Sequence, residues 1–166
     1  IAQALSLCQN FVQNEPFVVV LGDNVLGADI GHEVEAFKAQ IASGEGGARV
    51  LLKKVHDPER YGVPEFDGDR ILRVIEKPAV PPSSFSVVGI YFYDASVFDF
   101  IDDLKPSERG ELEISDVSNM YADKGTLSHG ILTSWWGDAG TFDGLEEAGK
   151  LARDLFYEEL GNEGAR

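Results

Sequence analysis

The sequence is short of positive charge. Its 166 residues include 14 Lys and Arg against 29 Asp and Glu, which gives a formal charge of −15 at pH 7. This balance argues against a general affinity for nucleic acid, because such binding needs clustered positive charge. It also means that a phosphate-binding site would need a few placed cations, or a metal ion, to overcome the overall field. The simplest interpretation of the acidity is solubility or a saline habitat.

Cysteine, histidine clusters and long apolar runs are also missing. Cys8 is the one cysteine, so no disulfide forms within the chain, and we expect this side chain in the core. His32, His56 and His129 are scattered without ligand spacing, which excludes a zinc site of the usual kind. No run approaches the roughly 20 apolar residues of a membrane helix, and no signal peptide is visible. We therefore expect a cytoplasmic protein without a membrane partner.

A further absence concerns the stretch FVVVLGDN, residues 17–24. Such a continuous apolar run is typical of a strand that is buried on both faces of an α/β sheet. Nucleotide-binding sheets usually have a glycine-rich phosphate loop before such a strand, and none is present. The glycines of GEGG, residues 44–47, follow a helical pattern and precede a strand, which is the wrong context. Since the chain also starts inside a helical pattern, we expect a fragment.

The remaining sequence alternates between helical and extended patterns. The first strand, a helix and the strand ARVLLKKV form a β-α-β order, which favours a parallel pair with a right-handed crossover. No repeat, low-complexity segment or linker interrupts the chain, so we predict one α/β unit with a mixed sheet. We expect helices over residues 1–12, 31–44, 95–105, 111–125 and 141–160, and strands over 17–21, 48–55, 85–94 and 126–136, with a hairpin around residues 67–69.

Two aspartates follow predicted strands. Asp23 comes after VVVLG and Asp138 comes after the strand LSHGILT, in WWGDAGT. Ligands of open α/β sheets bind beyond the carboxyl ends of the strands, so we expect both side chains at one edge of the sheet. Two converging carboxylates suit Mg²⁺, which prefers oxygen ligands and completes its shell with water and substrate phosphate. The alternative is that each aspartate caps a turn or a helix.

The segment VIEKP places an acid and a base side by side at the end of a strand. Glu76 could accept hydrogen bonds from sugar hydroxyls, and Lys77 could contact a phosphate as a point charge. Adjacent strand residues normally point to opposite faces, so the backbone would have to turn here for both to reach one pocket. The alternative is a surface ion pair, which contributes little to stability.

Two more positions are candidates for substrate binding. Gly62, in RYGV, would let a ligand approach the backbone closely, although an ordinary turn would also explain it. Arg109 lies in the loop SERGELEIS, where its guanidinium could bind a phosphate through two parallel hydrogen bonds. The alternative for Arg109 is a solvated loop charge.

In combination, these segments resemble a known family. LGDN, DPERYGVPEFD, IEKP, VVGIYFYD, LKPSERGELEISD and WWGDAGT occur in one order over roughly residues 1–160. Together they resemble the sugar-1-phosphate nucleotidylyltransferases, and among them the glucose-1-phosphate thymidylyltransferases. The resemblance implies a Rossmann-like, mostly parallel sheet that lacks its first strands and phosphate loop. It also implies that residues 1–166 are a single, partial domain, the part that binds the sugar phosphate and the metal.

The resemblance also implies roles for individual residues. Asp23 and Asp138 would be catalytic Mg²⁺ ligands, and Lys77 and Arg109 would hold the sugar phosphate. The other implied substrate-binding positions are Gln3 near the base, Gly62, Glu76 and Gly89 in the sugar pocket, Tyr91 nearby, and Asn24 and Tyr61. One departure is Gly137, where the family usually carries a larger apolar residue, so the rigidity with which Asp138 is held is expected to differ from that in the family.

The implied reaction is attack of a sugar-phosphate oxygen on the α-phosphorus of a nucleoside triphosphate, with loss of pyrophosphate. The expected substrates are dTTP and glucose 1-phosphate, in the dTDP-rhamnose pathway. Because the phosphate loop is missing, we expect this chain alone to be inactive. We also expect self-association, since the absent strands would leave an apolar strand edge open. The alternatives are a uridylyl- or cytidylyltransferase, or a non-catalytic regulatory module with this fold.

Overall fold

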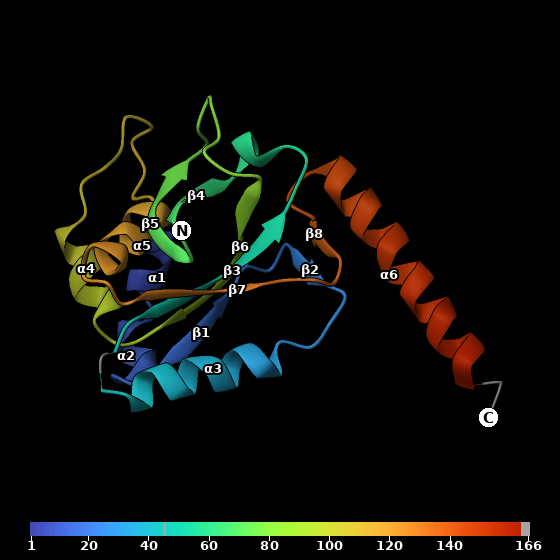
Figure 1. Ribbon diagram of the computed structural model, residues 1–166, viewed down its shortest axis with the longest axis horizontal. Coiled ribbons are helices and arrows are strands. Elements are labelled where there is room, and N and C mark those ends of the chain that lie inside the picture. The colour runs from blue at the N-terminus through green and yellow to red at the C-terminus, as the bar shows by residue number, and fades with distance from the viewer. Residues whose placement is uncertain (45, 164–166) are drawn as a thin grey trace.

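The computed structural model describes residues 1–44 and 46–163 of the chain (Figure 1). The helices are α1 (Ala2–Ser6), α2 (Gln9–Val12), α3 (Gly31–Ala42), the short 3₁₀ helix η1 (Pro58–Arg60), α4 (Val97–Asp103), α5 (Ile114–Asp123) and α6 (Phe142–Glu163). The strands are β1 (Phe17–Val20), β2 (Asn24–Leu26), β3 (Ala48–Lys54), β4 (Gly62–Asp67), β5 (Arg70–Glu76), β6 (Phe85–Tyr93), β7 (Leu127–Ile131) and β8 (Trp136–Asp138). No helix in these ranges combines the length and the apolar character that crossing a bilayer requires.

The central sheet has the strand order β1-β6-β3-β7. Strand β6 runs antiparallel to both β1 and β3, whereas β3 and β7 are parallel. Three strands therefore run in one direction, which confirms an α/β fold with a mixed sheet. The expected direct pairing of the first two strands is wrong, because β6 lies between them. Strand β6 is the longest strand and is buried along almost its whole length, so it takes the centre of the sheet.

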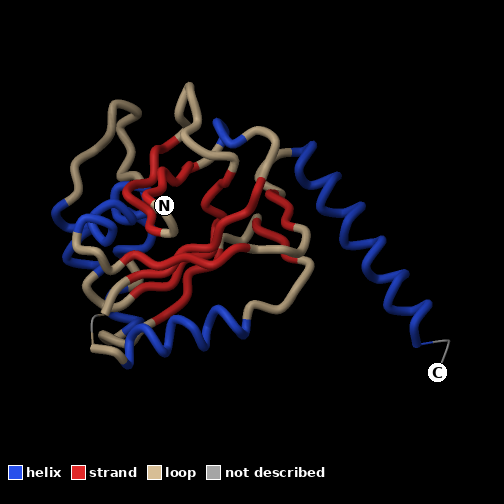
Figure 2. Tube along the Cα trace, viewed as in Figure 1, coloured by secondary structure: helices blue, strands red, loops and turns tan. Residues whose placement is uncertain are grey.

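Alternate side chains of the central strands pack on opposite faces of the sheet, as the two-residue period of a strand requires. Ile90 and Phe92 of β6 join Leu51 and Phe37, and the last of these anchors α3 to one face. The neighbouring residues of β6 face the other cluster, which α1, α4 and α5 cover. Figure 2 shows the helices separated into these two groups around the strands. The two-sided burial explains why the strand segments are nearly continuous apolar runs.

The first segment of the chain differs from expectation. The predicted helix over residues 1–12 is divided into α1 and α2, and this break leaves Cys8 exposed instead of buried. Strand β1 forms an edge of the sheet. Val18 and Val20 are 38% and 55% exposed, so the predicted burial of β1 on both faces is wrong. The expected open strand edge is confirmed.

The last segments also differ in part. The predicted strand over residues 126–136 ends at Ile131, and β8 forms a separate pair with β2. Helix α6 packs against β8 near its start, where Ala148 is buried, and then projects away from the sheet (Figure 1). Phe142 and Leu145 are 93% and 57% exposed, so its apolar face is only partly covered. The predicted hairpin is confirmed, with Gly68 at a φ of 59° in the turn between β4 and β5.

Candidate functional site

The β2–β8 pair brings the two predicted carboxylates together. Asn24 is the register partner of Asp138, and the carbonyl oxygen of Asp23 accepts a hydrogen bond from the Ala139 amide at 2.7 Å. A Cβ atom placed on Gly140 would lie 3.0 Å from Asp23 Oδ2 and 3.0 Å from Asp138 Oδ1. Both carboxylates therefore lie beside Gly140, where the absence of a side chain leaves room for them, and Asp138 Oδ1 accepts a hydrogen bond from the Gly140 amide at 3.0 Å.

This arrangement fits a hard divalent cation. Mg²⁺ is typically bound through one or two carboxylates and takes its other ligands from water and substrate phosphates. Within residues 1–44 and 46–163, no cluster of three or more His, Cys, Asp or Glu side chains is suited to hold a metal ion. A metal held by Asp23 and Asp138 would thus have two protein carboxylates and would depend on water and the substrate for its remaining ligands. The role of Asp23 and Asp138 as metal ligands stays a prediction.

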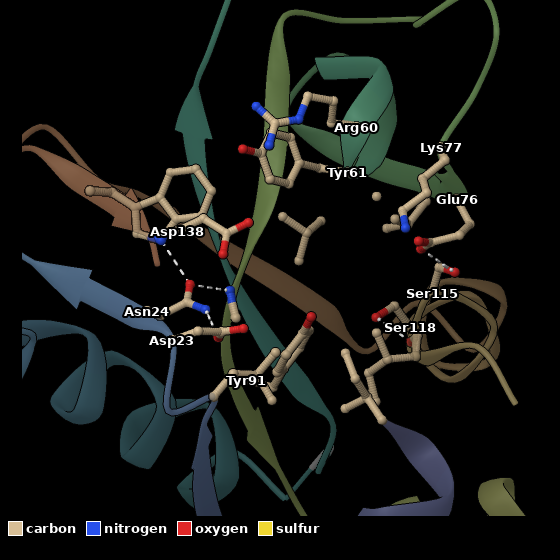
Figure 3. A pocket seen from close by; sticks show the side chains of 18 residues that line it. Asp23, Asn24, Arg60, Tyr61, Glu76, Lys77, Tyr91, Ser115, Ser118 and Asp138 are labelled. Atoms are coloured by element: carbon tan, nitrogen blue, oxygen red, sulfur yellow. Dashed lines mark hydrogen bonds between the residues drawn. The ribbon is translucent and has the colours of Figure 1, made fainter. Parts of the chain in front are cut away.

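The two carboxylates open onto a cavity of about 290 Å³. Figure 3 shows them on one side of this cavity, with Glu76 and Lys77 on the opposite side. Most of the residues predicted from the sequence meet here although they are distant along the chain. Those lining the cavity are Asp23, Asn24, Tyr61, Gly62, Glu76, Lys77, Gly89, Tyr91 and Asp138.

The backbone turns at the end of β5, which is the condition for the adjacent side chains of Glu76 and Lys77 to reach one pocket. Lys77 has a φ of 43°, in the left-handed region that residues other than glycine rarely adopt. Its amide donates to the Tyr61 carbonyl oxygen at 2.9 Å, which helps to hold this conformation. Both Glu76 and Lys77 consequently line the cavity. Ser115 Oγ donates to Glu76 Oε2 at 3.1 Å and orients that carboxylate.

The two predicted glycines line the cavity for different reasons. A Cβ on Gly62 would lie 3.1 Å from the Val74 side chain and 3.6 Å from Glu76 Oε2, so glycine keeps the cavity open beside Glu76. A Cβ on Gly89 would lie 2.4 Å from Asn24 Nδ2. Glycine at residue 89 is therefore required for the amide of Asn24 to pack on β6.

The phenol of Tyr91 lies between the two acidic parts of the cavity, with its hydroxyl directed inward (Figure 3). Burial raises the pKa of Tyr91, and the negative charges of Glu76 and Asp23 raise it further. The pKa of Tyr61 is also raised, chiefly by burial. Both hydroxyls are therefore protonated at neutral pH and are available as hydrogen-bond donors.

Two predicted residues do not line the cavity. Arg109 is 44% exposed at its rim, where its guanidinium lies 3.6 Å from carboxylate oxygens of Glu76, Glu111 and Glu113. Of these carboxylates only Glu111 is exposed, whereas Glu76 and Glu113 are 25% and 10% exposed, so the three acids together hold Arg109 beside Glu76 at the rim. Gln3 lies exposed on α1, and Ile1 is the residue of that segment that lines the cavity.

Among the lining residues that the sequence analysis did not name as candidates, four have polar groups in their side chains. They are Arg60, Ser115, Ser118 and Trp136. The Arg60 guanidinium lies 2.7 Å from Asp57 and 5.5 Å from the centre of the Tyr61 ring. Trp136 packs edge-on against Tyr61, with the ring centres 5.4 Å apart. Each of these residues lies within or close to the motifs RYGV, SERGELEIS and WWGDAGT, which already contained candidate residues. Closeness in sequence to those candidates was therefore the signal that could have identified them.

The fold and the cavity are those expected of a nucleotidyl transferase, and comparison with known proteins supports this class. The nucleotidyl transferase family pattern matches residues 1–154, and the chain belongs to this family. It is 40% identical to a glucose-1-phosphate thymidylyltransferase of Neisseria meningitidis over 158 residues, which are 93% of this chain and 54% of that protein. A low-salt glycan biosynthesis nucleotidyltransferase of Haloferax volcanii is 35% identical over 91% of this chain and 42% of its own length.

Solved structures agree with this assignment. A Bacillus anthracis protein assigned as a glucose-1-phosphate thymidylyltransferase, in complex with sucrose, has a TM-score of 0.85 and 50% identity. The match covers 93% of this chain and 61% of that one. A UDP-glucose pyrophosphorylase with UDP-glucose has a TM-score of 0.80 at 21% identity, over 96% of this chain and 62% of that one, and it shows the shared fold. The chain spans about half the length of the curated relatives it matches.

Proposed function

We propose that this chain supplies the sugar-phosphate and metal-binding part of a nucleotidyltransferase. The reaction would transfer a nucleotidyl group from a nucleoside triphosphate, dTTP, to a sugar 1-phosphate, glucose 1-phosphate, and release pyrophosphate. The observation that carries the proposal is that Asp23 and Asp138 lie close together beside Gly140 and line a cavity that Glu76 and Lys77 also line. The names of the thymidylyltransferase relatives support the choice of substrates, and the dTDP-rhamnose pathway is part of the proposal.

The residues of the cavity suit the two ends of a sugar phosphate. The Glu76 carboxylate would accept hydrogen bonds from sugar hydroxyls, and Tyr91 would donate one. Lys77 would bind the phosphate, with Arg109 reaching it from the rim. The left-handed backbone of Lys77 supports this role, because strained conformations cluster at binding sites.

Catalysis would come from alignment and from neutralisation of phosphate charge. A bound Mg²⁺ would supply a Lewis acid and a template for the phosphates. Asp23 and Asp138 would hold it, while Lys77 fixes the direction of the attacking sugar-phosphate oxygen. No residue is needed to form a covalent intermediate. The −15 charge of the chain increases the importance of these few positive groups.

The first test is binding of glucose 1-phosphate in the presence of Mg²⁺, measured by calorimetry. Loss of one charge-assisted contact costs about 1.5–3 kcal/mol, so Lys77→Ala should weaken binding about 10- to 100-fold. Lys150→Ala is the matched control, because Lys150 is an exposed lysine paired with Glu146 on α6. Equal binding by parent and Lys77→Ala would contradict the proposal.

The second measurement is turnover of dTTP and glucose 1-phosphate, with UTP and CTP in parallel. The chain contains no glycine-rich phosphate loop before β1, so we expect binding of the sugar phosphate without turnover. Turnover at an ordinary enzymatic rate would refute the expected inactivity. A faster reaction with UTP or CTP would favour the uridylyl- or cytidylyltransferase alternative. Binding of neither substrate would favour a regulatory module.

A further inference from the structure

The side chain of Asn24 joins three separate segments around the cavity. Its Nδ2 donates to Asp23 Oδ1 at 2.8 Å. Its Oδ1 accepts hydrogen bonds from the Gly89 amide at 2.9 Å and from Trp136 Nε1 at 2.7 Å. The partners belong to the loop after β1, to β6 and to β8, and the dashed lines of Figure 3 meet at this amide.

These partners permit a single orientation of the amide. The backbone N–H of Gly89 and the indole N–H of Trp136 are both donors without acceptor capacity. They must therefore face Oδ1, which leaves Nδ2 for the Asp23 carboxylate. Assignment of the amide nitrogen and oxygen thus follows from the hydrogen-bond network. These bonds use both acceptor sites of Oδ1 and one of the two Nδ2 hydrogens, so one N–H of Asn24 remains for a substrate and its predicted substrate-binding role stays a prediction.

The hydrogen bond from Asn24 to Asp23 determines which carboxylate oxygen of Asp23 stays free of Asn24. Because Asn24 holds Oδ1, the other oxygen of Asp23, Oδ2, is the one on the side of Gly140 and Asp138. We infer that Asn24 is a positioning residue, which directs Asp23 Oδ2 toward the Asp138 carboxylate and fixes Trp136 on the cavity wall. This inference rests on the proposed function, in which Asp23 and Asp138 hold the metal.

Packing supports the inference independently of any ligand. The amide of Asn24 occupies the space in which a Cβ on Gly89 would lie, so its position is restricted on that side. Trp136 in turn packs edge-on against Tyr61. Hydrogen-bond partners of metal-binding side chains commonly alter metal affinity by about 10- to 100-fold when they are removed. Asn24 is placed to act in this way on Asp23 while it also holds the aromatic pair.

The test measures Mn²⁺ affinity by electron paramagnetic resonance, using the metal alone as the probe. We expect Asn24→Ala to weaken Mn²⁺ binding about tenfold or more. Asn119→Ala is the matched control, because this amide also makes two hydrogen bonds, to the backbone of Val74, and none to a carboxylate. Asn119→Ala should lower stability without changing Mn²⁺ affinity. Asn24→Ser is made in parallel, so that the result does not depend on the folding of one variant.

A second readout follows the tryptophan. In a Trp135→Phe background, the emission of Trp136 should shift on Asn24→Ala but not on Asn119→Ala, because only the former removes its hydrogen-bond acceptor. Unchanged Mn²⁺ affinity in both Asn24 variants would overturn the positioning role.

Asp138→Asn separates this inference from the proposed function. Strong loss of Mn²⁺ binding in Asp138→Asn, with unchanged binding in the Asn24 variants, refutes the inference alone. Unchanged binding in Asp138→Asn refutes the metal site of the proposed function.

Discussion

Three glycines of the site have no room for a larger side chain, because other groups approach them closely. Gly62, Gly89 and Gly140 all stand where an added Cβ would meet a functional side chain at 3.6 Å or less. None of the three has a positive φ. The requirement for glycine at these positions thus comes from neighbouring atoms and not from backbone conformation. Substitutions here should change binding more than they change folding.

Gly62→Ala tests this directly. The new methyl group would lie 3.1 Å from Val74 Cγ1 and close to Glu76, in the space proposed for the sugar. Overpacking of this kind costs about 1–3 kcal/mol, so the affinity for glucose 1-phosphate should fall about tenfold or more in calorimetry. Gly149→Ala is the control, since a Cβ there meets nothing within 4 Å. Unchanged affinity in Gly62→Ala would place the sugar elsewhere.

Among the elements, α3 is attached to the sheet by charge as well as by apolar packing. Glu33 on this helix is 3% exposed and forms an ion pair with Arg49 of β3 at 2.5 Å. A Cβ on Gly130 of β7 would overlap the Glu33 carboxylate, so glycine there makes room for it. Arg49 also donates to Ser128 of β7. The pair therefore ties α3 to the two strands β3 and β7.

Removing one partner of this pair should be costly. Glu33→Ala leaves the Arg49 guanidinium largely buried without its carboxylate, and breaking a buried pair costs on the order of 3–5 kcal/mol. Urea unfolding should show a loss of this size. Glu35→Ala on the same helix is the control, because its pair with Lys38 is 71% and 66% exposed and should contribute less than about 1 kcal/mol. Equal effects would show that Glu33 does not anchor α3.

At the scale of the whole molecule, two groups of exposed apolar side chains stand out among the residues that the structure describes. One is the β1 edge, where Val18 and Val20 adjoin the exposed Phe11 of α2. The other is the outer face of α6, with Phe142 and Leu145. An open strand edge with apolar side chains favours pairing with another chain. The homo-oligomer expected from the sequence therefore stays a prediction with a structural basis at β1.

Self-association through β1 can be tested by sedimentation velocity over a range of concentrations. The parent chain should associate as the concentration rises. Val20→Lys places a charge on the edge strand and should shift the chain toward the monomer. Val80→Lys is the control, because Val80 is 85% exposed in the proline-rich loop, away from β1. A parent chain that stays monomeric at high concentration would refute association through this edge.

Local patterns in the sequence determined most elements and the membership of the site. The spacing of apolar residues and the glycines at turns are local features of the sequence. The motifs around Asp23, Glu76 and Asp138 are local too, so all of these can be recognised without knowledge of the fold. The resemblance of these motifs to a family also led to the correct family. Cys8 was misplaced, because a break between two short helices depends on contacts with the rest of the chain.

Other properties depended on tertiary structure. Strand order could not be predicted, because β6 is inserted between β1 and β3 through contacts distant in sequence. The three bonds of Asn24 could not be predicted either, since Gly89 and Trp136 lie 65 and 112 residues away along the chain. The sequence alone determined which side chains were available for phosphate and metal chemistry. Only the packing of β2 against β8 decided that Asp23 and Asp138 lie side by side, because that geometry arises from long-range pairing.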